Sequence, residues 1–194
     1  MAAITSPDYT LGGTELQARV REIFESIGLS VGEGPTDRED LILNAPDLKE
    51  PTIPIIVEVK SGNKTRPNHS HLRQLDDWVF DVSDEGNVRR KGILNQGRKR
   101  NWLSRGAEQA SPLHSNPHKG LLIYNGPLDV PFEDRPQPIL DEHTRKLAEK
   151  RSFCVMSMRS LLSWAGACQN SEIELAEFWK NVQMSMGELD EFKA

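Results

Sequence analysis

The sequence predicts an α/β fold in which a small, mostly buried mixed sheet lies between helices. Four short aliphatic runs indicate strands, and apolar residues at helical spacing indicate the helices between them. In chain order the pattern is helix, strand, strand, helix, strand, helix, strand, helix. The 194 residues suffice for a single domain, and we find no internal repeat.

The first predicted helix spans 14–27. Thr14 followed by Gln17 forms a capping-box pattern, and Gly28 is a natural C-terminal stop. Apolar residues recur every three or four positions on one helical face, as expected for an amphipathic helix. These residues are Leu16, Val20, Ile23, Phe24 and Ile27.

Two strands are predicted next, at 40–44 and 55–60, and both are apolar along both faces, as in strands covered on two sides. Pro54 confines the second strand to a start near residue 55. Two further strands are predicted at 120–125 and 153–158.

The remaining helices are predicted at about 70–82 and 140–150, after the fourth strand with Leu161, Leu162 and Trp164, and at about 171–190, where the C-terminal helix is acidic and amphipathic. The first of these helices is followed by a long polar loop at about 84–118. The domain core is therefore expected over about 12–165 of a single domain spanning 1–194.

Composition excludes several classes of protein. The 24 Lys and Arg against 29 Asp and Glu give a net charge of −5, which excludes a histone-like polycation. The chain has no apolar run near 18 residues and no signal-peptide pattern at its start. Cys154 and Cys168 do not form a secreted disulfide framework. We therefore expect a cytoplasmic protein that does not enter a membrane.

Acidic residues in the first two predicted strands indicate chemistry. Asp40 begins one strand, and Glu58 and Lys60 leave the same face of the next because they are two residues apart. Two neighbouring carboxylates repel each other unless a cation lies between them, and oxygen ligands favour Mg²⁺. Beside such an ion, Lys60 would orient a water or stabilise charge on a phosphate. This arrangement suits hydrolysis of a phosphodiester.

Asp40 and the run Glu58-Val59-Lys60, behind a helix that carries Glu15, resemble the PD-(D/E)xK nuclease superfamily, especially its RecB-like and Mrr-like branches. Gln74, on the helix after this run, matches a further RecB-like feature. The resemblance implies a restriction-endonuclease-like fold, with an αβββαβ core, a small mixed central sheet flanked by helices, and a C-terminal helix.

The resemblance also implies roles for individual residues. Asp40, Glu58 and the carbonyl of Val59 would bind Mg²⁺, for which Mn²⁺ would substitute, and Lys60 would assist the attack of water. Glu15 and Gln74 would support the site. The residue before Asp40 is Glu39 where the family pattern has Pro. Strand alternation places Glu39 and Asp40 on opposite faces, and Asp40 is favoured as the ligand because it immediately precedes the aliphatic run.

Each of these residues also has an ordinary interpretation. Glu58 and Lys60 could form an ion pair at a solvated strand end, and Glu15 could complement a helix dipole. Gln74 could be a helix-surface residue. His69 and His71 are expected to be ordinary surface histidines in a loop.

The polar region contains seven basic residues without an intervening acid. Such a run is usually a solvated loop, but beside a nuclease site it would bind the DNA backbone. The residues are Arg89, Arg90, Lys91, Arg98, Lys99, Arg100 and Arg105.

The sequence thus predicts a metal-dependent deoxyribonuclease, endonucleolytic in action, that serves defence, restriction or DNA repair. DNA is the expected partner. A homodimer would supply two sites for two strands, and a partner protein from a defence or repair system is a further option. The alternative is a catalytically silent or partner-gated nuclease-like module that binds nucleic acid or protein.

Overall fold

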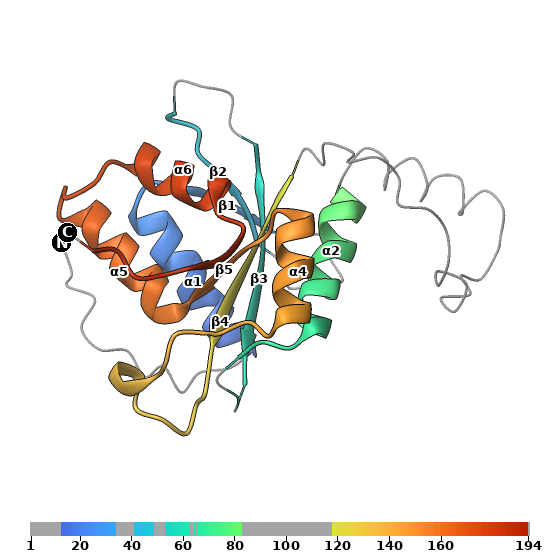
Figure 1. Cartoon of the computed structure of the whole chain (residues 1–194). Coiled ribbons are helices and arrows are strands. Elements are labelled where there is room, and N and C mark those ends of the chain that lie inside the picture. Colours follow the sequence, from blue (N-terminus) through green and yellow to red (C-terminus); the bar gives the residue numbers. More distant parts are fainter. Residues whose placement is uncertain are drawn as a thin grey trace, which may run out of the picture.

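The computed structural model describes residues 13–33, 41–48, 53–62, 64, 66–82 and 118–193. They form one six-stranded mixed sheet with helices on both faces (Figure 1). One face is covered by α1 (Gly13–Ser26), α5 (Met158–Gln169) and α6 (Leu175–Met184). The other face is covered by α2 (His69–Val82) and α4 (Glu142–Arg151). The predicted α/β architecture is confirmed.

The strands cross the sheet in chain order. The first three strands form an antiparallel group, in which β2 pairs with both β1 and β3. They are β1 (Ser30–Glu33), β2 (Leu41–Asn44) and β3 (Ile55–Ser61). The later strands run parallel to β3, and each follows at least one helix, as parallel connections require. These strands are β4 (Lys119–Asn125), β5 (Cys154–Ser157) and β6 (Gly187–Leu189).

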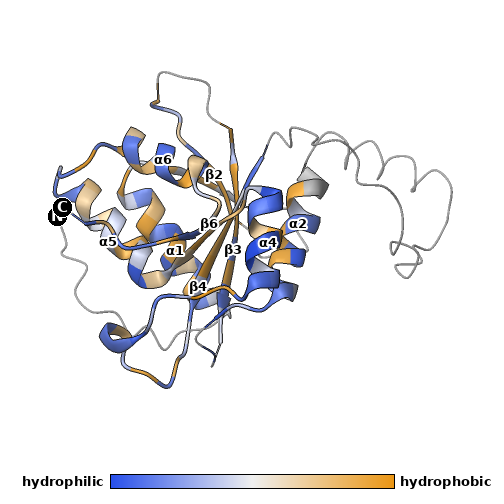
Figure 2. Cartoon of the chain, in the orientation of Figure 1, coloured by the Kyte–Doolittle hydropathy of each residue, from blue (hydrophilic) through white to orange (hydrophobic). Residues whose placement is uncertain are grey.

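Two apolar clusters fill the space between the sheet and its helices. Strand alternation assigns side chains to them, so that Val57 belongs to the cluster under α1 and Ile56 to the cluster under α2. Figure 2 shows hydrophobic residues along the sheet and on the helix sides that face it. Every residue of β4 is buried, which makes it the central strand that its aliphatic sequence predicts.

Helix α1 ends as the sequence predicts. Gly28 has a φ of +93°, a conformation that favours glycine, and the Leu29 amide donates to the Phe24 carbonyl over 3.1 Å. Its start differs from the prediction. The helix begins at Gly13, so Thr14 lies within its first turn and is not its N-cap.

The sequence prediction is wrong about some short elements. Local hydrophobic pattern does not locate strands β1 and β6, because their sequences, Ser-Val-Gly-Glu and Gly-Glu-Leu, contain no aliphatic run. The C-terminal helix predicted at 171–190 is shorter. It ends at Met184, and Gly187, with a φ of +98°, pairs with Cys154 at the sheet edge. Pairing with β5 therefore replaces the last predicted helical turns.

His69 and His71 belong to the first turn of α2 and not to a loop. The Asn68 side chain accepts hydrogen bonds from the Ser70 and His71 amides, which caps the helix. The predicted basic loop lies almost entirely outside the described residues. None of the described helices has the length and apolarity needed to cross a membrane.

Candidate active site at the end of strand β3

Glu58 and Lys60 lie on the face of β3 that α2 covers, since both share the strand parity of the Ile56 side chain. Glu58 is buried, with 1% of its surface exposed, whereas 29% of the Lys60 side chain is exposed. The Lys60 ammonium forms an ion pair with Oε1 of Glu58. A buried carboxylate is costly unless it is paired, so this contact stabilises an acid at an otherwise apolar position.

A cavity of about 220 Å³ lies against the end of β3. Three elements line it: β3 through residues 58–61, α1 through Gly13 and Gln17, and α2 through Trp78. Because α1 and α2 pack on opposite faces of the sheet, the cavity opens beside the edge of β3, between the two helices.

The pairing register of β3 with its two neighbouring strands shows where the cavity lies in the sheet. Within the described part of the chain, β2 pairs with β3 only at Ile55–Val57, with Leu41 opposite Val57. On its other side β3 pairs with β4 along its whole length, to Ser61 opposite Asn125. The edge of β3 that carries Glu58 and Lys60 therefore extends past the described start of β2.

Helix α2 presents a stripe of side chains toward this part of β3. His71, Gln74 and Trp78 are three and four residues apart, so they share one helical face. Trp78 lines the cavity, and Gln74, half-buried, lies between Trp78 and His71 on this stripe. Burial, and secondarily the positive charge of Lys60, lower the pKa of His71 from its ordinary value of 6.5.

Tyr124 lies directly opposite Lys60 in the parallel β3–β4 pair. Its hydroxyl donates to the Lys64 carbonyl over 3.0 Å, and its ring lies 6.0 Å from the His71 ring. Burial raises the pKa of Tyr124. The Tyr124 phenol thus stays protonated at neutral pH and ties the segment after β3 to the sheet.

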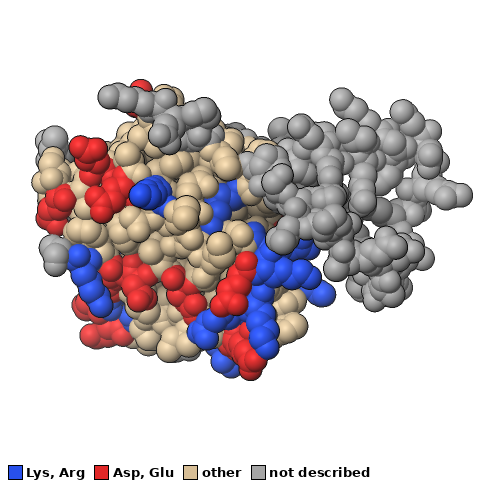
Figure 3. Space-filling model, turned by 45° about the horizontal axis from the view of Figure 1, so that its top comes forward, with Lys and Arg blue, Asp and Glu red and all other residues tan. Residues whose placement is uncertain are grey.

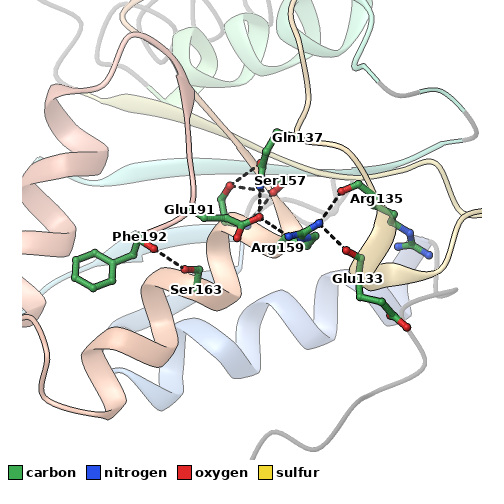
Figure 4. Close-up of polar contacts among 9 residues, drawn as sticks. Glu133, Arg135, Gln137, Ser157, Arg159, Ser163, Glu191 and Phe192 are labelled. Carbon is green, nitrogen blue, oxygen red and sulfur yellow. Dashed lines mark hydrogen bonds and ion pairs between the residues drawn. The ribbon is translucent and has the colours of Figure 1, made fainter. Parts of the chain in front are cut away.

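The carboxyl end of β4 is held by a second polar cluster. Arg135 is buried and donates to Oδ1 of Asn125 over 2.6 Å and to the Val130 carbonyl over 3.0 Å. Arg159 donates to the carbonyls of Glu133 and Arg135 (Figure 4). These contacts hold the loop after β4, and Arg135 does not line the cavity at β3.

The structure brings together only some of the predicted site residues. Glu58, Val59 and Lys60 line the cavity, and Gln74 lies on the helix stripe that faces it. Glu15 is exposed in the first turn of α1, and Gln17 lines the cavity in its place. Asp40 lies outside the described residues, as do the seven basic residues between Arg89 and Arg105.

Sequence reasoning misses several residues near this site, among them Gln17, His71 and Tyr124. It gives Gln17 only a capping role, His71 only a place in a loop, and Tyr124 only a place in a strand. Helical or strand periodicity predicts the element that each of these residues belongs to. It does not predict which strand end a given helix covers, so it cannot place them at the site.

The oxygen groups of the site fit a hard divalent cation. Mg²⁺ takes one or two carboxylates and keeps several waters, and Glu58 supplies one carboxylate to a cavity large enough for a hydrated ion. The described residues contain no group of three or more His, Cys, Asp or Glu side chains that could hold a metal. Among the described residues that line the cavity, Glu58 is the one carboxylate.

Charges of both signs occur on the surface shown in Figure 3, with Lys and Arg gathered toward the side where α2 and α4 lie. Arg145 and Lys146 of α4 belong to ion pairs with Glu188 and Glu142, at 3.0 and 2.6 Å. These cations are already partly neutralised. Helix α4 therefore has less positive charge available to bind a polyanion than its number of Lys and Arg residues suggests.

No family model and no curated protein matches the chain. Among solved structures, it is similar to the restriction endonuclease FokI, with a TM-score of 0.53 and 13% sequence identity. The fold is restriction-endonuclease-like. The similarity covers 95% of this chain but only 30% of the FokI chain. At this identity the restriction-endonuclease-like similarity concerns the fold alone.

Proposed function

We propose that this protein is a metal-dependent nuclease that hydrolyses phosphodiester bonds in DNA. The observation that carries the proposal is a buried Glu58 paired with Lys60 at a cavity in a restriction-endonuclease-like fold. A carboxylate that is 1% exposed is rare unless it is paired or binds a metal. Here the carboxylate is paired and lines a cavity at the end of β3.

Glu58, the Val59 carbonyl and Asp40 are the proposed metal ligands. Asp40 directly precedes Leu41, and Leu41 lies opposite Val57 in an antiparallel pair. A strand continued by one residue would bring Asp40 beside Glu58. A divalent ion such as Mg²⁺ polarises a phosphoryl oxygen and lowers the pKa of its bound water, and Mn²⁺ would serve in its place.

Lys60 is the residue proposed to position the attacking water or to stabilise charge on the phosphate. Its side chain is partly exposed at the cavity, and its ammonium already pairs with Glu58. With the Glu58 carboxylate bound to a cation, the Lys60 ammonium would be available to donate a hydrogen bond to the attacking water or to a phosphate oxygen. Gln74 on α2 supports this arrangement, and the basic residues between 89 and 105 bind the DNA backbone.

A gel assay tests the proposal. Supercoiled plasmid and labelled linear single-stranded and double-stranded DNA are incubated with Mg²⁺, Mn²⁺ or EDTA. We expect metal-dependent cutting of the plasmid that is lost in Glu58→Gln, Asp40→Ala and Lys60→Ala proteins. Glu22→Gln is the control, because Glu22 belongs to an exposed ion pair on α1 and should cut normally.

The other outcomes separate the alternatives. Cutting confined to linear ends would indicate an exonuclease. Full cleavage by the Glu58→Gln protein would refute the proposed site. DNA binding without cutting under any metal would instead favour a silent or partner-gated module. A role in defence, restriction or repair and a partner protein are further proposals from the family resemblance, and a homodimer would supply two sites for two strands.

A further inference from the structure

Helix α1 contributes its Gln17 side chain to the cavity at β3. Gly13 and Gln17 both line the cavity and are four residues apart, so they lie one above the other on the same helical face. Leu16, next to Gln17, is buried against the sheet. The packing of α1 therefore places Gln17, which is half-buried, at the boundary between core and cavity.

Glu15 lies on the opposite side of the same helix. Each helical residue turns by about 100°, so Glu15 is about 200° from both Gly13 and Gln17. It shares the exposed face with Arg19, four residues later, whose guanidinium pairs with Glu22 over 2.6 Å. Glu15 is itself exposed. The Glu15 carboxylate therefore points toward solvent and not toward the cavity.

We propose that Gln17, and not Glu15, is the residue of α1 that acts in the site. With a divalent cation bound, the Gln17 amide would accept a hydrogen bond from a metal-bound water through Oε1 and would donate one to a phosphate oxygen of the substrate through Nε2. This inference rests on the proposed nuclease function.

The chemistry of an amide differs from that of a carboxylate in two ways. A carboxylate accepts hydrogen bonds only, whereas the Gln side chain also donates two. An amide in the cavity that Glu58 lines also adds no negative charge where a phosphate would bind. Gln17 can therefore contact metal-bound water and phosphate together, which a Glu at this position could not do.

Terbium luminescence tests the inference without requiring cleavage. Tb³⁺ occupies oxygen-rich cation sites and emits when a nearby indole is excited, and Trp78 lines the same cavity. We expect Glu58→Gln and Trp78→Phe to remove this emission. Gln17→Ala should weaken Tb³⁺ binding about 10-fold, as is typical when a group that orients metal-bound water is removed. Glu15→Ala, the matched control on the same helix, should bind Tb³⁺ like the wild type.

The variant Gln17→Glu separates the two proposed contacts. Its added carboxylate should tighten Tb³⁺ binding, whereas the absence of the Nε2 donor should weaken binding of labelled DNA in Ca²⁺. A thermal melt of each variant checks folding. The Gln17→Asn protein keeps the amide but shortens it, and it should fall between wild type and Gln17→Ala.

Two results would overturn the inference. One is weaker Tb³⁺ binding in Glu15→Ala with unchanged binding in Gln17→Ala. The other is Tb³⁺ emission that does not depend on Glu58, because the cation would then not be bound in the cavity that Gln17 lines. If the Gln17 effects appear but the wild type cuts no DNA, the nuclease proposal fails and the assignment of Gln17 to the cation site stands.

Discussion

The Lys60 ammonium pairs with the Glu58 carboxylate two residues before it, on the face of β3 that α2 covers. The pair joins a fully buried acid to a base whose side chain is 29% exposed. It therefore neutralises a charge that would be costly to bury alone and keeps both groups at the cavity.

Removing the cation of this pair should destabilise the fold. In Lys60→Met, the Glu58 carboxylate stays buried without the Lys60 charge, and we expect stability to fall by about 2–3 kcal/mol, somewhat less than for a fully buried pair. Adding Glu58→Gln should recover much of this difference. Urea denaturation of both variants measures it. Equal stability of the single and double variants would show that the pair contributes little.

His71 should make stability depend on pH. Its pKa in the folded protein lies below the ordinary value of 6.5, chiefly because the ring is buried. Between these two values the unfolded chain binds a proton and the folded protein does not, so stability rises with pH and falls on acidification. Denaturation at pH 7.5 and 5.0 should show a larger acid destabilisation for the wild type than for His71→Asn. Equal destabilisation of the two proteins would contradict the assignment.

Two glycine substitutions should have opposite effects. A Cβ at Gly120 would meet Cδ1 of Phe153 at 2.5 Å, so Gly120→Ala should cost about 1–3 kcal/mol through overpacking. A Cβ at Gly166, within helix α5, meets nothing within 4 Å, and Gly166→Ala should stabilise by about 0.5–1 kcal/mol. Thermal melts measure both. A destabilised Gly166→Ala protein would argue against the described packing of α5.

Arg159 should stabilise the segment after β6. Its guanidinium bonds Oε1 of Glu191 over 2.9 Å and two carbonyls of the loop after β4 (Figure 4). We expect Arg159→Met to cost about 1–2 kcal/mol, since the substitution removes several hydrogen bonds to a charged group together. Lys146→Met removes an exposed ion pair with Glu142 and should cost much less. Similar destabilisation by both substitutions would contradict this role.

The predicted binding of DNA by the basic run can be measured by its salt dependence. Replacing Arg98, Lys99 and Arg100 by Ala should weaken DNA binding regardless of sequence. The slope of log K against log salt should fall by about 0.9 for each phosphate that the variant no longer neutralises. Binding in Ca²⁺ at several salt concentrations tests this. An unchanged slope would show that these cations do not bind the backbone.

Local patterns in the sequence are sufficient to predict the longer elements. The spacing of Leu16, Val20 and Phe24 predicts helix α1, and a β-branched run predicts β3. Both signals come from neighbouring residues of one element, so no knowledge of distant packing is needed. Strands β1 and β6 lack such a signal, because pairing with β2 and β5 defines them.

The same division applies to the candidate site. The sequence by itself determined that Glu58 and Lys60 share one face of a strand, because strand periodicity is a local property. Only the tertiary structure decided that α1 turns Gln17, and not Glu15, toward this strand end. It also decided that Tyr124 lies opposite Lys60. Which helix face meets which strand end depends on how apolar surfaces from distant parts of the chain pack together, and no single segment encodes that choice.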